Sequence, residues 1–180
     1  MTDPGGRLGG VKVAVLLEDG FEDLEFWVPV MRLREEGAEV RVVGTEAGVT
    51  ATGKHCLTAS SDVAAGAVSA EDFDAVVVPG GWAPDKMRRH AAMTELVARA
   101  HSQGKIVGLI CHAGLVGISA GIVKGSKATG SLGIKDDLVN AGAEWVDGPA
   151  FRDGNIVWRR VVDDIPDFCR ELVAALTPGG

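Results

Sequence analysis

The residue types with the clearest potential for chemistry are a cysteine and a histidine that stand side by side after an apolar run. Residues 105–111 read "KIVGLIC", and His112, Ala113 and Gly114 follow. A turn between a strand and a helix exposes a thiol and places it near the positive end of the helix dipole, which favours the nucleophilic thiolate. Small neighbours suit such a sharp turn. Cys111 is therefore the candidate nucleophile, while the competing interpretation is an ordinary buried thiol.

His112 is either a general base or a surface residue that caps a helix. A catalytic imidazole is normally oriented by a carboxylate. Acidic residues follow two other predicted strand ends, and most of them are expected to serve only as helix caps or dipole partners. These candidates are Glu18, Asp19, Glu22, Asp23, Glu25 and Asp85.

The turn at Pro79, Gly80 and Gly81 is either a plain tight turn or a nest of backbone N–H groups for an oxyanion. His55 and Cys56 are adjacent, but no second pair of metal ligands accompanies them, and they are interpreted as loop or core residues. The sequence contains no GxGxxG or Walker pattern. It predicts neither a metal nor a cofactor.

Composition restricts the class of protein. The chain has 180 residues, 46% hydrophobic and 24% charged, which fits one globular domain. No apolar run approaches the length of a membrane helix, and a net charge of −7 without a basic stripe argues against a nucleic-acid partner. Three dispersed cysteines suit a reducing cytoplasm. Residues 1–10 lack a signal-peptide pattern and are expected to be a flexible leader before a single domain at 11–177.

Hydrophobic periodicity predicts strands that alternate with helices. The expected strands are 11–17, 38–44, 73–81 and 105–111, with short ones in "SKATGS" and "AEWV" and a hairpin around 153–154; the expected helices are 21–37, 85–103, 133–142 and 163–176. This order is typical of an α/β fold with a mostly parallel sheet. Ligands bind at the carboxyl ends of such strands, where "LLEDGFED", "VVVPGGWAPD" and "GLICHAG" all fall.

These segments, together with "RLREEGAEV", "TGKH", "SAGIVKG", "GIKDDLVNAGAEWVD" and "DGN", resemble the ThiJ/PfpI family over residues 11–176. Within that family the chain resembles the branch of the PfpI-type intracellular peptidases and deglycases. The resemblance implies a flavodoxin-like three-layer sandwich, related to class I glutamine amidotransferases, with a cysteine nucleophile elbow.

The resemblance also implies roles for individual residues. Cys111 would be the nucleophile, and Glu22 would hydrogen-bond its sulfur. His112 would be oriented by a carboxylate from a neighbouring subunit, at the position of Asp85, so that the site requires a homodimer or a higher homo-oligomer. Gly80 and Gly81 would form the oxyanion hole together with the backbone of His112.

Three segments depart from the family pattern, and each borders the pocket in the family. Ala113-Gly114 stands where relatives have Gly-Pro, and Ser131-Leu132 replaces Tyr-Pro. The strand that usually ends in Ser-Arg or Thr-Arg reads "VWRRV", which places Trp158 and an extra Arg159 beside the matching Arg160. Trp82 and Trp158 are expected to rebuild an apolar pocket surface. The nucleophile machinery is thus expected to be kept and substrate recognition to have changed.

The predicted function is that of a cytoplasmic cysteine-dependent enzyme that acts on a small electrophilic carbonyl or acyl compound. Glyoxalase- or deglycase-like chemistry is the family default, and a hydratase or lyase of a biosynthetic pathway is a variant. The alternative from a different class is a redox-sensing or chaperone-like stress protein that uses the same thiol without turnover. A non-catalytic relative with a structural role is a third hypothesis.

Overall fold

The computed structural model of the chain describes residues 6–177. Within this range seven strands form the central sheet, in the order β10 (Ala150–Asp153), β11 (Ile156–Arg159), β7 (Ile106–Ile110), β6 (Ala75–Val78), β1 (Lys12–Leu16), β2 (Glu39–Gly44) and β5 (Val63–Ala64). Every neighbouring pair is parallel except β10–β11. All residues of β6 and β7 are buried, as expected for parallel strands that are covered on both faces.

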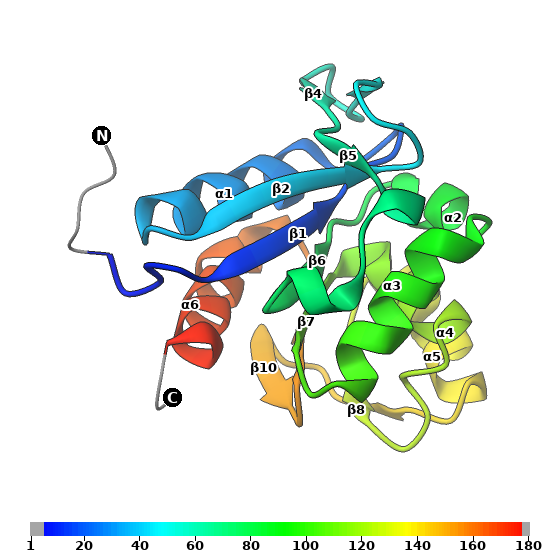
Figure 1. Cartoon of the computed structure of the whole chain (residues 1–180). Coiled ribbons are helices and arrows are strands. Elements are labelled where there is room, and N and C mark those ends of the chain that lie inside the picture. Colours follow the sequence, from blue (N-terminus) through cyan, green and yellow to red (C-terminus); the bar gives the residue numbers. More distant parts are fainter. Residues whose placement is uncertain (1–5, 178–180) are drawn as a thin grey trace.

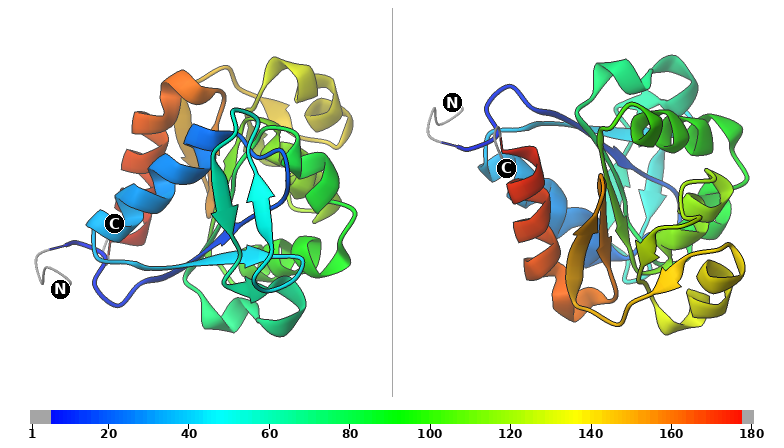
Figure 2. Two further views of the ribbon diagram at one scale, coloured as in Figure 1. Left: turned by 90° about the horizontal axis from the view of Figure 1, so that it is seen from above. Right: turned by 90° about the horizontal axis from the view of Figure 1, so that it is seen from below.

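Helices cover both faces of this sheet. On one side lie α1 (Asp23–Glu35) and α6 (Ile165–Leu176), which pack against each other. On the other side lie α2 (Ala83–Met87), α3 (Ala91–Ser102), α4 (Gly114–Ser119) and α5 (Lys135–Asn140) (Figures 1 and 2). The fold is therefore the predicted α/β sandwich with a mostly parallel sheet, and the hairpin predicted around 153–154 is β10–β11.

The remaining elements are short. Two small sheets pair β3 (Thr50–Thr52) with β4 (Thr58–Ser60) and β8 (Lys127–Ala128) with β9 (Glu144–Trp145). The 3-10 turns are η1 (Ala65–Ala67), η2 (Ala70–Asp72), η3 (Cys111–Ala113), η4 (Leu132–Ile134) and η5 (Val162–Asp164). Among the described residues, no helix combines the length and the apolar character that crossing a membrane requires.

Two local predictions differ from the structure. The single helix expected at 85–103 is two helices, because His90 adopts an extended backbone conformation between α2 and α3. The β3–β4 hairpin was not predicted. It buries one side chain in each strand, Ala51 and Ala59, so it carries almost no hydrophobic signal.

The predicted flexible leader also differs over its second half. Leu8 is fully buried, and its N–H donates to the carbonyl of Glu36 over 2.8 Å. The Arg7 guanidinium pairs with the Glu36 carboxylate at 2.8 Å, and Glu36 caps the end of α1. Arg7 and Leu8 are thus packed against the end of the first helix. Residues 1–5 of the predicted leader lie outside the described range.

Candidate active site

The three segments that were expected to meet at the carboxyl edge of the sheet do meet there. The loop after β1 and the loop after β6 are joined by an antiparallel bridge between Phe21 and Gly81. The N–H of Glu22 donates to the Gly80 carbonyl at 3.1 Å, and the N–H of Trp82 donates to the Gly20 carbonyl at 2.8 Å. These backbone bonds fix the start of α1 against the Pro-Gly-Gly turn.

Cys111 lies directly after β7, the strand that neighbours β6 in the sheet. Its φ angle is 57°, a left-handed conformation that a residue with a Cβ adopts at an energetic cost. The neighbours pack closely: a Cβ on Gly114 would lie 2.8 Å from Ile134, and one on Gly130 would lie 2.7 Å from the Cys111 carbonyl oxygen. The small residues after the cysteine therefore allow a sharp, strained turn that leaves the thiol partly exposed.

Glu25, in the first turn of α1, supplies the carboxyl group beside this thiol. It is fully buried, and its Oε2 accepts a hydrogen bond from the Gly80 N–H at 2.8 Å. A Cβ on Gly80 would lie 2.3 Å from that oxygen and 2.8 Å from the Cys111 Cβ, so the two side chains face each other across the glycine. Burial, and secondly the charge of Glu22, raise the pKa of Glu25 to about 7.

The Cys111 thiol and Glu25 titrate as a coupled pair. Burial, and then the negative charge of ionised Glu25, raise the pKa of the thiol to about 12. Hydrogen bonds from the backbone N–H groups of His112 and Gly81 act in the opposite direction. Because the pKa of Glu25 lies at about 7, the pair loses its first proton near neutrality, and the thiolate paired with a protonated Glu25 is the minor form of that singly ionised pair.

His112 places its imidazole against the same sulfur. Its Nδ1 lies 3.2 Å from the Cys111 Sγ. Burial, and secondly the positive charge of Lys54, lower the pKa of His112, so the ring is neutral at pH 7. Among residues 6–177, no carboxylate forms an ion pair with this imidazole. The neutral ring is suited to accept and return a proton next to the thiol.

The structure corrects the role expected of Glu22. This residue caps α1: its Oε2 accepts from the N–H of Glu25 at 2.9 Å, and its Oε1 lies 3.8 Å from His55 Nε2. Glu25 is the acid beside the sulfur. The helix start contained part of the signal, because the side chain of a cap residue accepts from the backbone of the first turn, and Glu22 directly precedes α1.

The thiol opens into a pocket of about 360 Å³. Its lining contains two of the residues predicted for substrate binding, Gly81 and Ser131. It also contains Lys54 and residues 161–163, for which the sequence indicated no role, and His55, which was interpreted as a loop or core residue. Loop residues carry no hydrophobic pattern that would reveal such a position. The full lining is Glu22, Glu25, Lys54, His55, Gly81, Cys111, His112, Ser131, Val161, Val162 and Asp163.

Three of the predicted pocket residues have other positions. Trp158 is fully buried within the hydrophobic core, because it alternates along β11 with residues of the opposite face. Ala113 is also fully buried, under the turn. The N–H of Gly80 donates to Glu25, so it is not free to bind an oxyanion, whereas the N–H of Gly81 is directed at the sulfur.

The remaining predicted residues lie outside the lining of this pocket. Trp82 is 65% exposed, and the Lys54 ammonium sits 5.3 Å from the centre of its ring. Arg160 pairs with Asp147 and with Asp164 and lines an adjacent pocket of about 280 Å³. Asp85 is exposed and pairs with Arg89. Within this subunit, therefore, Asp85 is engaged away from His112.

The contact of Gly80 with both members of the pair gives a first test. Gly80→Ala is expected to lower the free energy of unfolding by about 1–3 kcal/mol, since the added methyl overlaps the Glu25 carboxylate and the Cys111 Cβ. Urea denaturation measures this loss. Gly66→Ala is the matched control, because nothing lies within 4 Å of its added methyl. Equal stability of the two variants would contradict the packing of Glu25 against Cys111.

The fold and the site together define an α/β protein of the class that presents a cysteine and a buried glutamate at the carboxyl edge of a parallel sheet. The chain belongs to the DJ-1/PfpI family, whose model matches residues 11–175. It is 43% identical over 166 residues to a deglycase of Pyrococcus abyssi, covering 92% of this chain and 99% of that protein. The deglycase PfpI of Pyrococcus furiosus is 41% identical over the same length, with the same coverage.

Two solved structures show the same fold. The first is a two-domain protein of Anabaena variabilis with DJ-1/ThiJ/PfpI-like and ferritin-like domains, which matches with a TM-score of 0.91 and 38% identity over 92% of this chain. The chain spans about half of that protein, 48%. The second is DJ-1beta of Drosophila melanogaster, with a TM-score of 0.87 and 27% identity over 93% of this chain and 90% of that one.

Proposed function

We propose that the protein is a cysteine-dependent enzyme that acts on small electrophilic carbonyl compounds, with a glyoxalase- or deglycase-like reaction. One observation carries the proposal. The Cys111 sulfur lies at a strained turn in a pocket, with the buried Glu25 carboxyl on one side and the His112 imidazole 3.2 Å away on the other. Relatives that are named deglycases, at 41–43% identity, support it.

The proposed reaction begins with transfer of the thiol proton to ionised Glu25. The sulfur adds to the carbonyl carbon of the substrate, and the N–H groups of Gly81 and His112 stabilise the oxyanion until it takes up a proton as a hemithioacetal. For methylglyoxal, neutral His112 then moves a proton from the former aldehyde carbon to the adjacent carbon, which gives a thioester. Water hydrolyses the thioester to lactate and frees the thiol, so the net change is addition of one water.

The size of the pocket supports a small substrate. A space of about 360 Å³ is at the lower end of the range for small-molecule sites. Val161 and Val162 contribute apolar surface, while Lys54 contributes one cation at the rim. This combination favours a compact carbonyl compound over an extended polypeptide.

The test is incubation of the purified protein with methylglyoxal, glyoxal and a glycated amino acid, with products followed by NMR. We expect lactate from methylglyoxal, or release of free amine from the glycated compound, in catalytic amounts. Consumption of no more than one equivalent per subunit would refute the enzyme assignment. Turnover of none of these compounds, together with turnover of an unsaturated or hydroxylated acid, would favour a hydratase or lyase.

The redox-sensing or chaperone-like function is the second candidate, because the same partly exposed thiol is open to oxidation. Peroxide treatment followed by mass spectrometry separates the two. A protein that forms a stable sulfinic acid at Cys111 and turns over no carbonyl compound would be a sensor. Oxidation that simply abolishes turnover would leave the enzyme assignment in place.

We also propose that the protein acts as a homo-oligomer in which Asp85 of one subunit orients His112 of another. The lack of a carboxylate partner for His112 within residues 6–177 of its own subunit supports this arrangement, as does the family resemblance. The exposed position of Asp85 leaves it accessible to a second copy.

Subunit mixing tests this arrangement. Asp85→Ala and Cys111→Ser are each expected to be inactive, while a refolded equimolar mixture is expected to recover about a quarter of wild-type activity, because about half of the dimers are mixed and each holds one complete site. A mixture of Cys111→Ser with Cys111→Ala is the control and should recover nothing. If the first mixture shows no more activity than its separate components, Asp85 does not act across an interface.

A further inference from the structure

Arg159 is a buried arginine to which the proposed reaction gives no role. It ends β11 and is fully buried. In the register of the parallel pair it stands opposite Ile110, the residue before Cys111. Its side chain points to the face that α1 and α6 cover, because Gly108, two residues before Ile110 on β7, faces Phe168 of α6.

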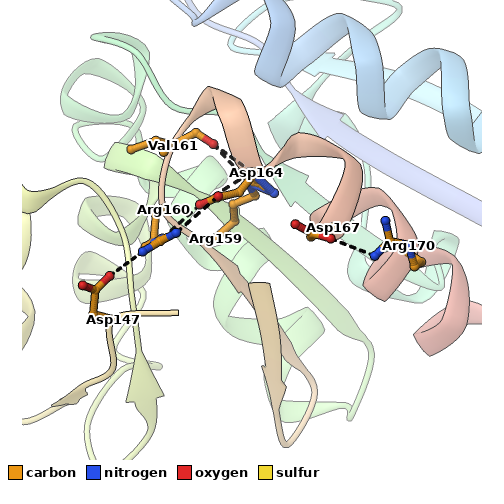
Figure 3. Close-up of polar contacts among 7 residues, drawn as sticks. All are labelled: Asp147, Arg159, Arg160, Val161, Asp164, Asp167 and Arg170. Carbon is orange, nitrogen blue, oxygen red and sulfur yellow. Dashed lines mark hydrogen bonds and ion pairs between the residues drawn. The ribbon is translucent and has the colours of Figure 1, made fainter. Parts of the chain in front are cut away.

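One side of the Arg159 guanidinium holds the pocket wall. Its Nε and Nη2 donate to the carbonyl of Val161 at 3.1 Å and 2.9 Å. Nη2 also lies 3.7 Å from Asp164, whose carboxylate binds Arg160 as well (Figure 3). Val161 is the first residue of the wall segment 161–163 that lines the cysteine pocket. The position of this wall therefore depends on a buried arginine.

The other side of the guanidinium carries an unpaired donor. Arg159 Nη1 is buried without a hydrogen-bond partner among residues 6–177, and the same is true of Glu25 Oε1. A buried ion without compensation is costly, so opposite charges on one side of the sheet stabilise each other. The positive charge of Arg159 acts to lower the pKa of Glu25, against burial and Glu22, which raise it.

Charged and titratable groups from several elements surround Glu25 and Arg159. The Glu25 carboxylate interacts electrostatically with Glu22 at the helix cap and with Arg159 at the end of β11, and it lies beside Cys111 after β7. The Arg159 guanidinium lies 3.7 Å from Asp164 in η5, and its charge also interacts with Arg160, the residue after β11, and with Asp167 and Cys169 of α6. Asp167 in turn pairs with Arg170 at 2.7 Å (Figure 3). Among Glu22, Cys111 and Arg159, the groups that act on Glu25, Arg159 alone carries a positive charge.

We propose that Arg159 is a positioning residue of this site, whose buried charge holds Glu25 in the ionised form that accepts the thiol proton and whose hydrogen bonds fix the wall at 161–163. The proposal deepens the proposed function, on which its role for Glu25 rests.

The coupling between Cys111 and Glu25 determines in which direction the pH midpoint of Cys111 reactivity should move. Without the Arg159 charge, the pKa of Glu25 rises, and the doubly protonated pair, thiol with carboxylic acid, persists to higher pH. Proton transfer from Cys111 to Glu25 then begins at higher pH as well. Removing the charge should therefore move the pH midpoint of Cys111 reactivity upward, whereas loosening the wall alone would change substrate affinity without moving that midpoint.

The experiment measures the rate of Cys111 alkylation by iodoacetamide between about pH 5 and 10, a range that brackets the titration of Glu25 near pH 7. Arg159→Gln and Arg159→Met are expected to raise the midpoint by about 0.5–1 unit, and Arg159→Lys, which keeps the charge, to leave it unchanged. Arg170→Gln is the control for loss of an exposed cation on the same face. Alkylation requires no turnover, so this result is independent of whether the substrate proposal holds.

Two outcomes would overturn the proposal: equal midpoints in wild type and Arg159→Gln, or the same upward shift in Arg159→Lys as in Arg159→Gln. Far-UV circular dichroism establishes that each variant is folded. If Arg159→Met does not fold, Arg159→Gln and Arg159→Lys still make the comparison. Adding Arg159→Gln to Glu25→Gln should shift nothing further, because the charge acts through Glu25. An additional shift in this double variant would place the action of Arg159 elsewhere.

Discussion

Cys111→Ser abolishes turnover of methylglyoxal, with an expected loss of about 10³-fold or more. A serine hydroxyl fits the same turn, but Glu25, with its pKa raised to about 7, is far too weak a base to deprotonate it. The sulfur is also the better nucleophile, so the covalent step fails although binding survives. Initial rates of lactate formation measure the loss, and the substrate-induced change in Trp fluorescence reports binding.

Cys56→Ser is the matched control for this variant. Cys56 is exposed, and like Cys111 it has a positive φ, of 72°, so the substitution carries a similar backbone demand. Its activity is expected to stay within about twofold of wild type, as for a surface substitution. Comparable turnover by wild type and Cys111→Ser would remove the thiol from the reaction and refute the proposed function.

The order of elements was predictable because the hydrophobic pattern is strong where the sheet is buried. Residues 75–78 and 106–110 are apolar and buried throughout, so each could be recognised as a strand before the strands that pair with it were known. The meeting of three loops follows from the same fact, since the carboxyl ends of neighbouring parallel strands share one edge. The Phe21–Gly81 bridge realises this expectation.

The choice between side chains at that edge was not predictable from pattern alone. Glu22 and Glu25 lie three residues apart at one helix start, and only the cap geometry decides which of them faces the sulfur. In the same way, "VWRR" does not say which side chains point to the core. The strand phase buries Trp158 in the hydrophobic core and Arg159 beneath α6, and it leaves Arg160 at the edge. Both corrections depend on orientation, which composition does not encode.

Glu25→Gln is expected to lower turnover by about 10²–10⁴-fold, the usual contribution of a general acid–base group. Gln keeps the shape and can still accept from the Gly80 N–H, but it cannot take the thiol proton. The limb of the pH–rate profile near pH 7, which belongs to Glu25, should disappear. Stability offers a second measurement: because the pKa of Glu25 is raised from 4.5, wild-type stability falls as pH rises through 7, and this fall should be absent in the variant.

Glu22→Gln decides which of the two acids serves the sulfur. Its amide oxygen still accepts from the N–H of Glu25, so the helix cap survives, while the charge that raises the pKa of Glu25 is lost. The limb near pH 7 should therefore move to lower pH, and turnover should remain within about tenfold of wild type, since no proton acceptor has been removed. The opposite ranking, with Glu22→Gln the inactive variant and Glu25→Gln the active one, would restore Glu22 as the partner of Cys111. It would also require the pocket to rearrange, since the Glu25 carboxyl occupies the space across Gly80 from the thiol.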